Sequence, residues 1–266
     1  MAAMRHHKLS FTVALTCISR VLILRDRVLG WVGPGSQDTP GLSAARLKIS
    51  SGANLLDAVF VQPTASPARA AMLLCHGIGE TVQHWFPVQR LLAANGVASL
   101  VFDYSGYGRS TGRPSSAQFD LDALSAFQTL RRHAHPLPTS ILGFSLGSGP
   151  AVAIVNAAAP DYLVLCGAFT SFRDALHAIG LPARLSPLVP PLWSAQQSLR
   201  DCRVPVLVVH GQNDRLFPVQ MARDLASCCP GPVELLIVSN LAHNQLFRKP
   251  DLSFWGPIIA RLYGES

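Results

Sequence analysis

Short apolar runs that alternate with amphipathic segments constrain the fold more than any other feature of this sequence. The later runs, of which residues 204–210 are the clearest, are continuously apolar. Continuous apolar runs are typical of parallel strands that helices cover on both faces. We therefore expect strands near residues 46–50, 55–61, 70–75, 97–102, 139–144, 162–168, 204–210 and 233–238.

Helical patterns fill the intervals between these runs. Residues 119–133 place Phe119, Ala123, Phe127 and Leu130 at spacings of three and four, as in an amphipathic helix. Strands that alternate with helices predict right-handed crossovers and a mostly parallel sheet, which binds ligands at the carboxyl ends of its strands. Similar helical segments lie near 84–94, 146–158, 218–228 and 251–263.

The first 41 residues form an N-terminal extension, and the Gly- and Pro-rich stretch 30–41 separates it from a single domain over 42–266. Residues 1–30 carry five cations around an apolar stretch, which Arg20 interrupts before it reaches the ~20 residues of a membrane span. Peripheral membrane contact, a signal-like segment, a poorly ordered extension and a misassigned start all stay open.

Composition excludes several classes of protein. Hydrophobic residues make up 49% of the chain and charged residues 14%, which argues against a disordered chain. The net charge is +7, but no Lys/Arg cluster is interleaved with aromatic residues, so we expect no nucleic-acid partner. The six cysteines show neither CxxC nor zinc-site spacing, which predicts free thiols, a cytoplasmic location and no metal.

One interval is too long for a simple connection between a helix and a strand. About 35 residues separate the strands that end near 168 and begin near 204, and prolines punctuate them. This segment is also rich in apolar side chains. We predict a small lid at about 171–203; the alternative is a surface helix and loop with no gating role.

Two Gly-x-Ser-x-Gly runs occur, Gly143–Gly147 and Gly108–Gly112, so the pentapeptide alone does not identify a nucleophile. A nucleophilic serine of this type needs a strand, a sharp turn and a helix in direct succession. Ser145 follows an apolar strand and precedes an apolar helix. Ser110 stands well beyond the end of its strand and precedes Arg-Pro-Ser-Ser, which is typical of a loop. We therefore predict Ser145 as the nucleophile.

A serine hydroxyl needs a base to take its proton. Where a nucleophilic serine occupies such a turn between a strand and a helix, the acid and then the base follow it along the chain. Three histidines lie downstream: His177 in the predicted lid, His210 at the end of a strand, and His243 in a loop after the last strand. The loop places His243 at the carboxyl edge of the sheet, so it is the predicted base.

The base needs a carboxylate to orient it. Asp214 lies in the turn after strand 204–210 and is the predicted acid. Asp174, which follows the preceding strand, is the alternative. The backbone N–H groups of Ile78 and Leu146 are predicted to form the oxyanion hole. Glu80 follows in the Ile78 loop, where Glu80 and Trp85 either line the entrance or are simply exposed.

Five motifs in this order resemble the α/β-hydrolase superfamily: His76-Gly77, Asp103–Ser110, Gly143–Gly147, His210–Asp214 and His243-Asn244. The resemblance runs from about residue 46 to the C-terminus. It is closest to a small-lid branch that includes serine-aminopeptidase-like hydrolases and protein depalmitoylases. It implies an α/β-hydrolase fold, His243 as the base and a structural role for the 103–108 run. The chain departs from the pattern at Ala242, where the family usually has glycine.

These observations predict an α/β-hydrolase fold, with a mostly parallel eight-stranded sheet, helices on both faces and a small lid. The predicted activity is hydrolysis of an ester or thioester of a small-molecule or acyl substrate, through an acyl-enzyme and without a cofactor. The alternatives are an aminopeptidase-like serine peptidase with Glu80 as its acidic anchor, a non-catalytic binding protein, and a scaffold tethered to membranes by residues 1–30. The oligomeric state stays open.

Overall fold

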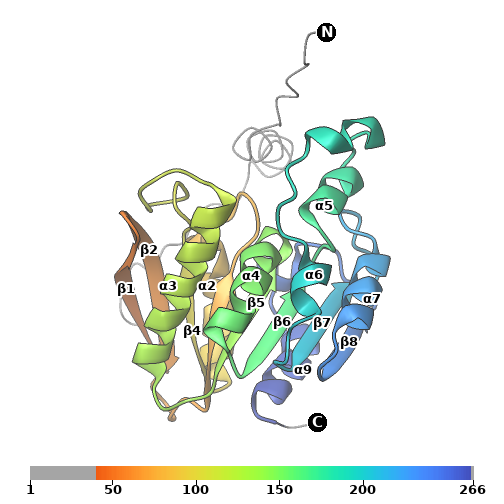
Figure 1. The fold of residues 1–266 in the computed structure, drawn as a ribbon. Helices are drawn as coiled ribbons and strands as arrows, with labels where there is room; N and C mark the ends of the chain where they lie inside the picture. The colour runs from red at the N-terminus through yellow and green to blue at the C-terminus, as the bar shows by residue number, and fades with distance from the viewer. Residues whose placement is uncertain (1–39, 265–266) are drawn as a thin grey trace.

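The computed structural model describes residues 40–264, which form one eight-stranded sheet between two layers of helices (Figure 1). The strand order is β1-β2-β4-β3-β5-β6-β7-β8. The pairs β1–β2 and β2–β4 are antiparallel and the other neighbours are parallel, which confirms the predicted mostly parallel sheet. The bounds are β1 Leu42–Ser51, β2 Asn54–Pro63, β3 Ala70–Cys75, β4 Val97–Phe102, β5 Thr139–Phe144, β6 Tyr162–Cys166, β7 Val206–Gly211 and β8 Val233–Val238.

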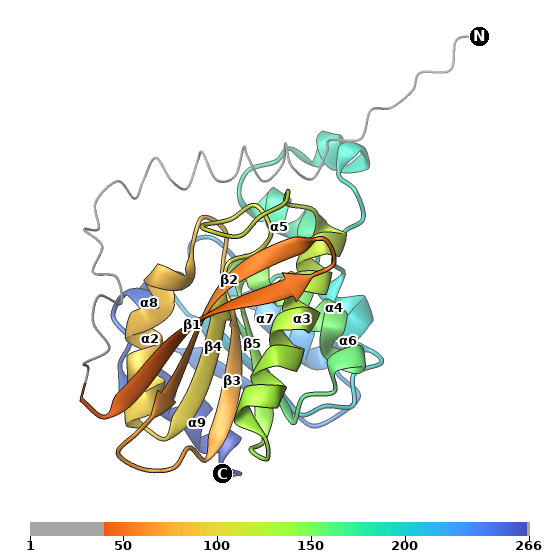
Figure 2. The same ribbon diagram turned by 90° about the vertical axis from the view of Figure 1, so that its left-hand side faces the viewer.

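Helices cover both faces of the sheet, because the central strands are apolar on both sides. Alternate residues of β3 show this division: Met72 and Leu74 pack toward one layer, and Leu73 and Cys75 pack toward the other. Figure 2 shows the two layers on opposite sides of the sheet. One layer holds α2 (Val82–Ala94), α8 (Gln245–Arg248) and α9 (Leu252–Leu262), and the other holds α3 (Ser116–Ala134), α4 (Ser148–Ala158), α6 (Ala195–Leu199) and α7 (Val219–Cys228).

Some predicted boundaries were wrong. The strand expected at 46–50 is a ten-residue strand, because its whole length pairs with β2 and only its inner face is apolar. β6 ends at Cys166 rather than 168, since Gly167 turns the chain at φ 53°. The helix expected from 146 begins at Ser148, after a 3-10 turn, η1 (Ser145–Gly147).

The segment predicted as a lid lies beyond the carboxyl ends of β6 and β7 (Figure 1). It contains α5 (Phe172–Ala178), the 3-10 helix η2 (Ala183–Leu188) and α6. An isolated antiparallel bridge pairs Ser171, at the start of this segment, with Ser194, which directly precedes α6. A separate core cluster combines four side chains of this segment, Phe172, Ala175, Leu176 and Val189, with Phe169 before it and Phe217 after β7.

The predicted N-terminal extension 1–41 and its membrane contact through residues 1–30 fall almost wholly outside the described residues. Within residues 40–264, no helix combines the length and the hydropathy that crossing a bilayer requires.

Candidate active site

Ser145 occupies a sharp turn between β5 and α4. Its φ is +52°, a conformation that few residues with a side chain adopt. The flanking glycines are required by close packing: a Cβ on Gly147 would lie 2.0 Å from the Cys75 carbonyl oxygen, and a Cβ on Gly143 would lie 2.7 Å from the Ser148 Cα. Direct contact between β3, β5 and the start of α4 thus creates the turn that the sequence predicts.

A continuous line of hydrogen bonds joins the three predicted catalytic residues. The Nε2 atom of His243 lies 2.9 Å from the Ser145 Oγ, and its Nδ1 atom lies 2.6 Å from an Asp214 carboxylate oxygen. Ser145 lies in the turn after β5, His243 in the loop after β8 and Asp214 in the turn after β7. The Asp214 side chain is only 1% exposed, and that of His243 is 10% exposed.

The turn after β7 holds the Asp214 carboxylate in place. Its Oδ1 accepts hydrogen bonds from the backbone N–H groups of Leu216 (2.8 Å) and Phe217 (2.9 Å). Burial disfavours the charged carboxylate, but the hydrogen bond to His243 and these two N–H groups outweigh it. The pKa of Asp214 is therefore held below its ordinary value, and the group stays ionised.

Aromatic contacts fix the ring of His243. It packs against Phe144 at 5.0 Å and edge-on against Phe217 at 5.2 Å between ring centroids. The family's glycine is not needed at Ala242, because this residue is exposed and has no positive φ. The Ala242 N–H instead donates to the Gln245 side chain at 2.7 Å, which helps to hold the loop.

The other downstream candidates do not contact Ser145. His210 is buried, its Nε2 donates to the Phe217 carbonyl at 3.0 Å, and burial lowers its pKa. His177 bonds within the lid to Leu181 O and Ser186 Oγ. Asp174 accepts hydrogen bonds from two neighbouring hydroxyl groups at 2.6 Å each.

Ser110 has a structural contact on both sides of its hydroxyl group. The Oγ donates to the Asp103 carbonyl at 2.6 Å and accepts from the Asp57 N–H at 2.9 Å. It therefore ties the loop after β4 to strand β2, as its assignment to a loop allows.

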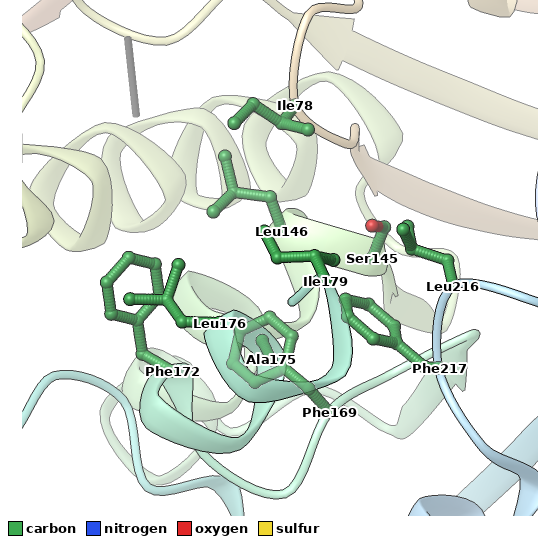
Figure 3. Close-up of a pocket in the computed structure, with 10 residues that line it drawn as sticks. All are labelled: Ile78, Ser145, Leu146, Phe169, Phe172, Ala175, Leu176, Ile179, Leu216 and Phe217. Carbon is green, nitrogen blue, oxygen red and sulfur yellow. The ribbon is translucent and has the colours of Figure 1, made fainter. Parts of the chain in front are cut away.

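Ile78 and Leu146, the predicted oxyanion residues, border a cavity at the Ser145 side chain (Figure 3). Ser145 supplies the one polar side chain of its lining. The cavity measures about 30 Å³, roughly the room for a water molecule. The remaining lining residues, which sequence patterns did not single out, are Phe169, Phe172, Ala175, Leu176, Ile179, Leu216 and Phe217.

The expectation that Glu80 and Trp85 line an entrance or are exposed was wrong. Glu80 is 8% exposed and Trp85 is fully buried. The Glu80 carboxylate accepts hydrogen bonds from the Gly77 N–H and the Trp85 Nε1, both at 2.8 Å. A run of loop residues gives no sign of such burial, because it depends on how the loop packs against α2.

Within residues 40–264, no three His, Cys, Asp or Glu side chains are grouped so as to hold a metal ion. The described cysteines are free thiols; burial raises the pKa of Cys75 to about 12, and Cys166 is shifted in the same direction.

Comparison with known proteins finds similarity to several hydrolases. A family model described as serine aminopeptidase, S33, matches residues 66–194. An uncharacterized protein of Mycobacterium tuberculosis is 30% identical over 185 residues, which are 68% of this chain and 65% of that protein. Lysophosphatidylserine lipase ABHD12 of Macaca fascicularis is 27% identical over 191 residues, which cover 64% of this chain and 48% of that lipase. The chain thus spans less than two thirds of the length of either relative.

The solved structures include an esterase of Pyrococcus furiosus, Pf2001, with a TM-score of 0.66 and 18% identity. The match covers 90% of this chain and 95% of the esterase. Together with the strand order, this likeness shows that the chain has the α/β-hydrolase fold.

Proposed function

We propose that this protein is a serine hydrolase that cleaves the ester or thioester of an apolar acyl group through an acyl-enzyme. The observation that carries the proposal is the line Asp214–His243–Ser145, which ends in a cavity with an apolar lining. Each of its two hydrogen bonds has the length that proton transfer in such a triad needs.

The proposed mechanism begins at His243. Its Nδ1–H donates to the ionised Asp214, so Nε2 is free to accept the Ser145 proton. The Ser145 Oγ then bonds to the substrate carbonyl carbon, and the carbonyl oxygen becomes an oxyanion. His243 returns the proton to the leaving alcohol or thiol as its bond to carbon breaks. Water repeats the sequence and releases the carboxylic acid.

The N–H groups of Ile78 and Leu146 are the proposed donors to the oxyanion. Ile78 lies in the loop after β3 and Leu146 directly follows the nucleophile, and both residues line the cavity at Ser145. Donors that are already in place stabilise the developing charge without reorganisation. The N-terminal end of α4 points toward the same site and favours negative charge there.

The cavity supports an apolar acyl group as substrate. Apart from Ser145, the described lining residues are aliphatic or aromatic, and a carbon chain loses no hydrogen bond when it packs against such side chains. A volume of about 30 Å³ is too small for such a chain, so part of the lining has to move. Five lining residues, from Phe169 to Ile179, lie on or next to α5, and we propose that this segment is the lid that moves.

The aminopeptidase alternative has less support. A substrate's free amino group needs an acidic partner, and Glu80 already binds Gly77 and Trp85 inside the protein. Among residues 40–264, no carboxylate lines the cavity next to Ser145. The names of the lipase ABHD12 and of the Pyrococcus esterase also favour an ester. A non-catalytic binding protein would not need the three side chains at hydrogen-bonding distance.

Labelling with a fluorophosphonate probe tests the proposal directly. We expect the wild type and Ser110→Ala to label and Ser145→Ala not to label. Esters, acyl thioesters and aminoacyl amides, assayed side by side, then identify the substrate class. Absence of labelling in the wild type, or full labelling of Ser145→Ala, would refute the proposed nucleophile. Membrane recovery that survives Ser145→Ala would instead support the scaffold alternative through residues 1–30.

A further inference from the structure

Glu80 is a buried carboxylate that the proposed mechanism does not use. It stands at the end of the loop that joins β3 to α2, two residues after Ile78. Its Oε2 atom receives two hydrogen bonds, from the Gly77 N–H and from the Trp85 Nε1, both at 2.8 Å. A buried charged group is costly unless it is well bonded, so this residue needs an explanation.

The contact with Gly77 is unusually close. A Cβ on Gly77 would lie 2.8 Å from the Glu80 Oε1 and 3.1 Å from the Phe144 ring. The Glu80 carboxylate therefore packs directly against the backbone of Gly77, where a side chain would not fit. Gly79, next to Ile78, has a φ of +74°. Residues 77–80 thus form a tight turn, and the hydrogen bond between the Glu80 side chain and the Gly77 N–H joins its two ends.

Trp85 anchors the other side of the same carboxylate. Its ring is fully buried on α2, stacks on Phe247 at 5.6 Å and lies 5.8 Å from Phe144, the residue before the nucleophile. Glu80 therefore links the turn to a rigid aromatic cluster beside the elbow.

Tyr107 packs against the turn from the opposite side. Burial raises the pKa of its phenol, and the negative charge of Glu80 raises it further. The turn that carries Ile78 is therefore held between the Trp85 cluster and Tyr107, with the Glu80 carboxylate at its centre.

We propose that Glu80 is a positioning residue of the oxyanion hole, which fixes the 77–79 turn so that the Ile78 N–H faces the Ser145 site. This inference rests on the proposed function. Glu80 acts through the backbone, because it binds Gly77 and does not line the cavity. A negative charge near a developing oxyanion would oppose catalysis. We therefore expect Glu80 to favour catalysis through the position of its acceptor oxygen at the Gly77 N–H, and not through its charge.

Two conservative variants separate the effect of side-chain length at Glu80 from the effect of its charge. Glu80→Gln keeps an acceptor oxygen at the same reach without the charge, whereas Glu80→Asp keeps the charge and withdraws the oxygen by one methylene. Loss of one oxyanion donor costs about 10²–10³ in kcat, so we expect a kcat about 100-fold lower for Glu80→Asp. We expect Glu80→Gln to stay within about fivefold of the wild type, with KM changed by less than about threefold in both.

A transition-state analogue gives a second readout that a merely structural role would not change. The affinity for a trifluoromethyl ketone, which forms an oxyanion on Ser145, is expected to fall with kcat/KM across the series. The matched control is Glu234→Asp, which shortens a half-exposed carboxylate at the start of β8 by the same methylene, and its kcat is expected to stay within about twofold. Thermal unfolding of each variant shows that the protein is folded.

The outcomes distinguish the two proposals. If the wild type hydrolyses an ester but Glu80→Asp is as active as Glu80→Gln, or the loss appears in KM alone, Glu80 does not position the hole and only this inference fails. A kcat that Gln lowers and Asp preserves would show that charge matters, and would also overturn it. A wild type that neither labels nor turns over any ester or thioester refutes the proposed function and this inference together.

Discussion

Ser145 and Ser110 share a pentapeptide pattern but lie in opposite physical settings. Ser145 has a strained φ of +52° and is followed by a helix, and its Oγ meets the Nε2 of His243. The φ of Ser110 is not positive, and its hydroxyl is occupied on both sides by backbone groups. The same short sequence therefore places one serine hydroxyl group against a histidine, where we propose that it reacts, and binds the other to backbone groups.

The glycines of the two runs show how this difference arises. A Cβ on Gly147 would meet the carbonyl oxygens of Cys75 and His76, so that glycine lets the elbow pack under β3. A Cβ on Gly108 would lie 1.8 Å from the Asp103 carboxylate, so that glycine lets a loop wrap around an acid. Each glycine allows another part of the chain to pack closely against its backbone. Only the packing at Gly147 lies next to the cavity where we propose that a substrate binds.

The two acids near these serines provide the prediction with the largest effect. The side chains of Asp214 and Asp103 are both buried and both accept backbone N–H groups, but Asp214 also accepts a hydrogen bond from His243. We expect Asp214→Asn to lower kcat by about 10⁴, because the amide disfavours the His243 tautomer that accepts the Ser145 proton. Asp103→Asn should leave kcat within about tenfold while lowering the free energy of unfolding by about 1–3 kcal/mol.

Steady-state turnover of an activated ester and chemical unfolding, measured on both variants, check this pair. A large loss of kcat in Asp103→Asn without a loss of stability would show that the Ser110 loop takes part in turnover. The comparison between the two serines would then be broken.

The intermediate effect concerns the stability of the serine variants. Ser110→Ala removes a hydroxyl that satisfies the Asp57 N–H and the Asp103 carbonyl, so we expect the free energy of unfolding to fall by about 1–2 kcal/mol. Ser145→Gly relieves a positive φ and should raise it by about 1 kcal/mol. Urea unfolding measures both changes. Equal destabilisation of the two variants would mean that Ser145 carries no backbone strain.

The sequence could predict the sheet and the three residues that the structure brings together as the proposed triad, because both depend on local patterns. Continuous apolar runs mark buried strands, and each triad residue follows such a run at the carboxyl edge of the sheet. The burial of Glu80 could not be predicted, since it depends on a turn that folds back onto Trp85 from α2. The apolar cavity was equally hidden, because its lining combines Ile78, α5 and the turn after Asp214.

The first strand was underestimated for a related reason. β1 lies at the edge of the sheet, and its outward residues are polar or charged, so only a short apolar core stands out in the sequence. Its length is set by pairing with β2, which extends over all ten residues. Pairing between strands is a tertiary property, and a pattern within one strand does not record it.

The smallest predicted effect is a pH dependence that sharpens the comparison further. Asp214 has an ordinary pKa of 3.8, which the His243 and backbone hydrogen bonds lower in the folded protein. Below pH 3.8 the unfolded chain takes up a proton that the folded protein still refuses, so unfolding becomes easier as pH falls. The contribution of Asp214 to stability is therefore complete above that pH and disappears as pH falls through the folded pKa.

We expect the stability difference between wild type and Asp214→Asn to shift in favour of the variant across this range, measured by thermal unfolding. The difference between wild type and Ser110→Ala should stay constant, since a lost hydroxyl does not titrate. A constant difference for Asp214→Asn as well would mean that the His243 contact does not stabilise the charged carboxylate.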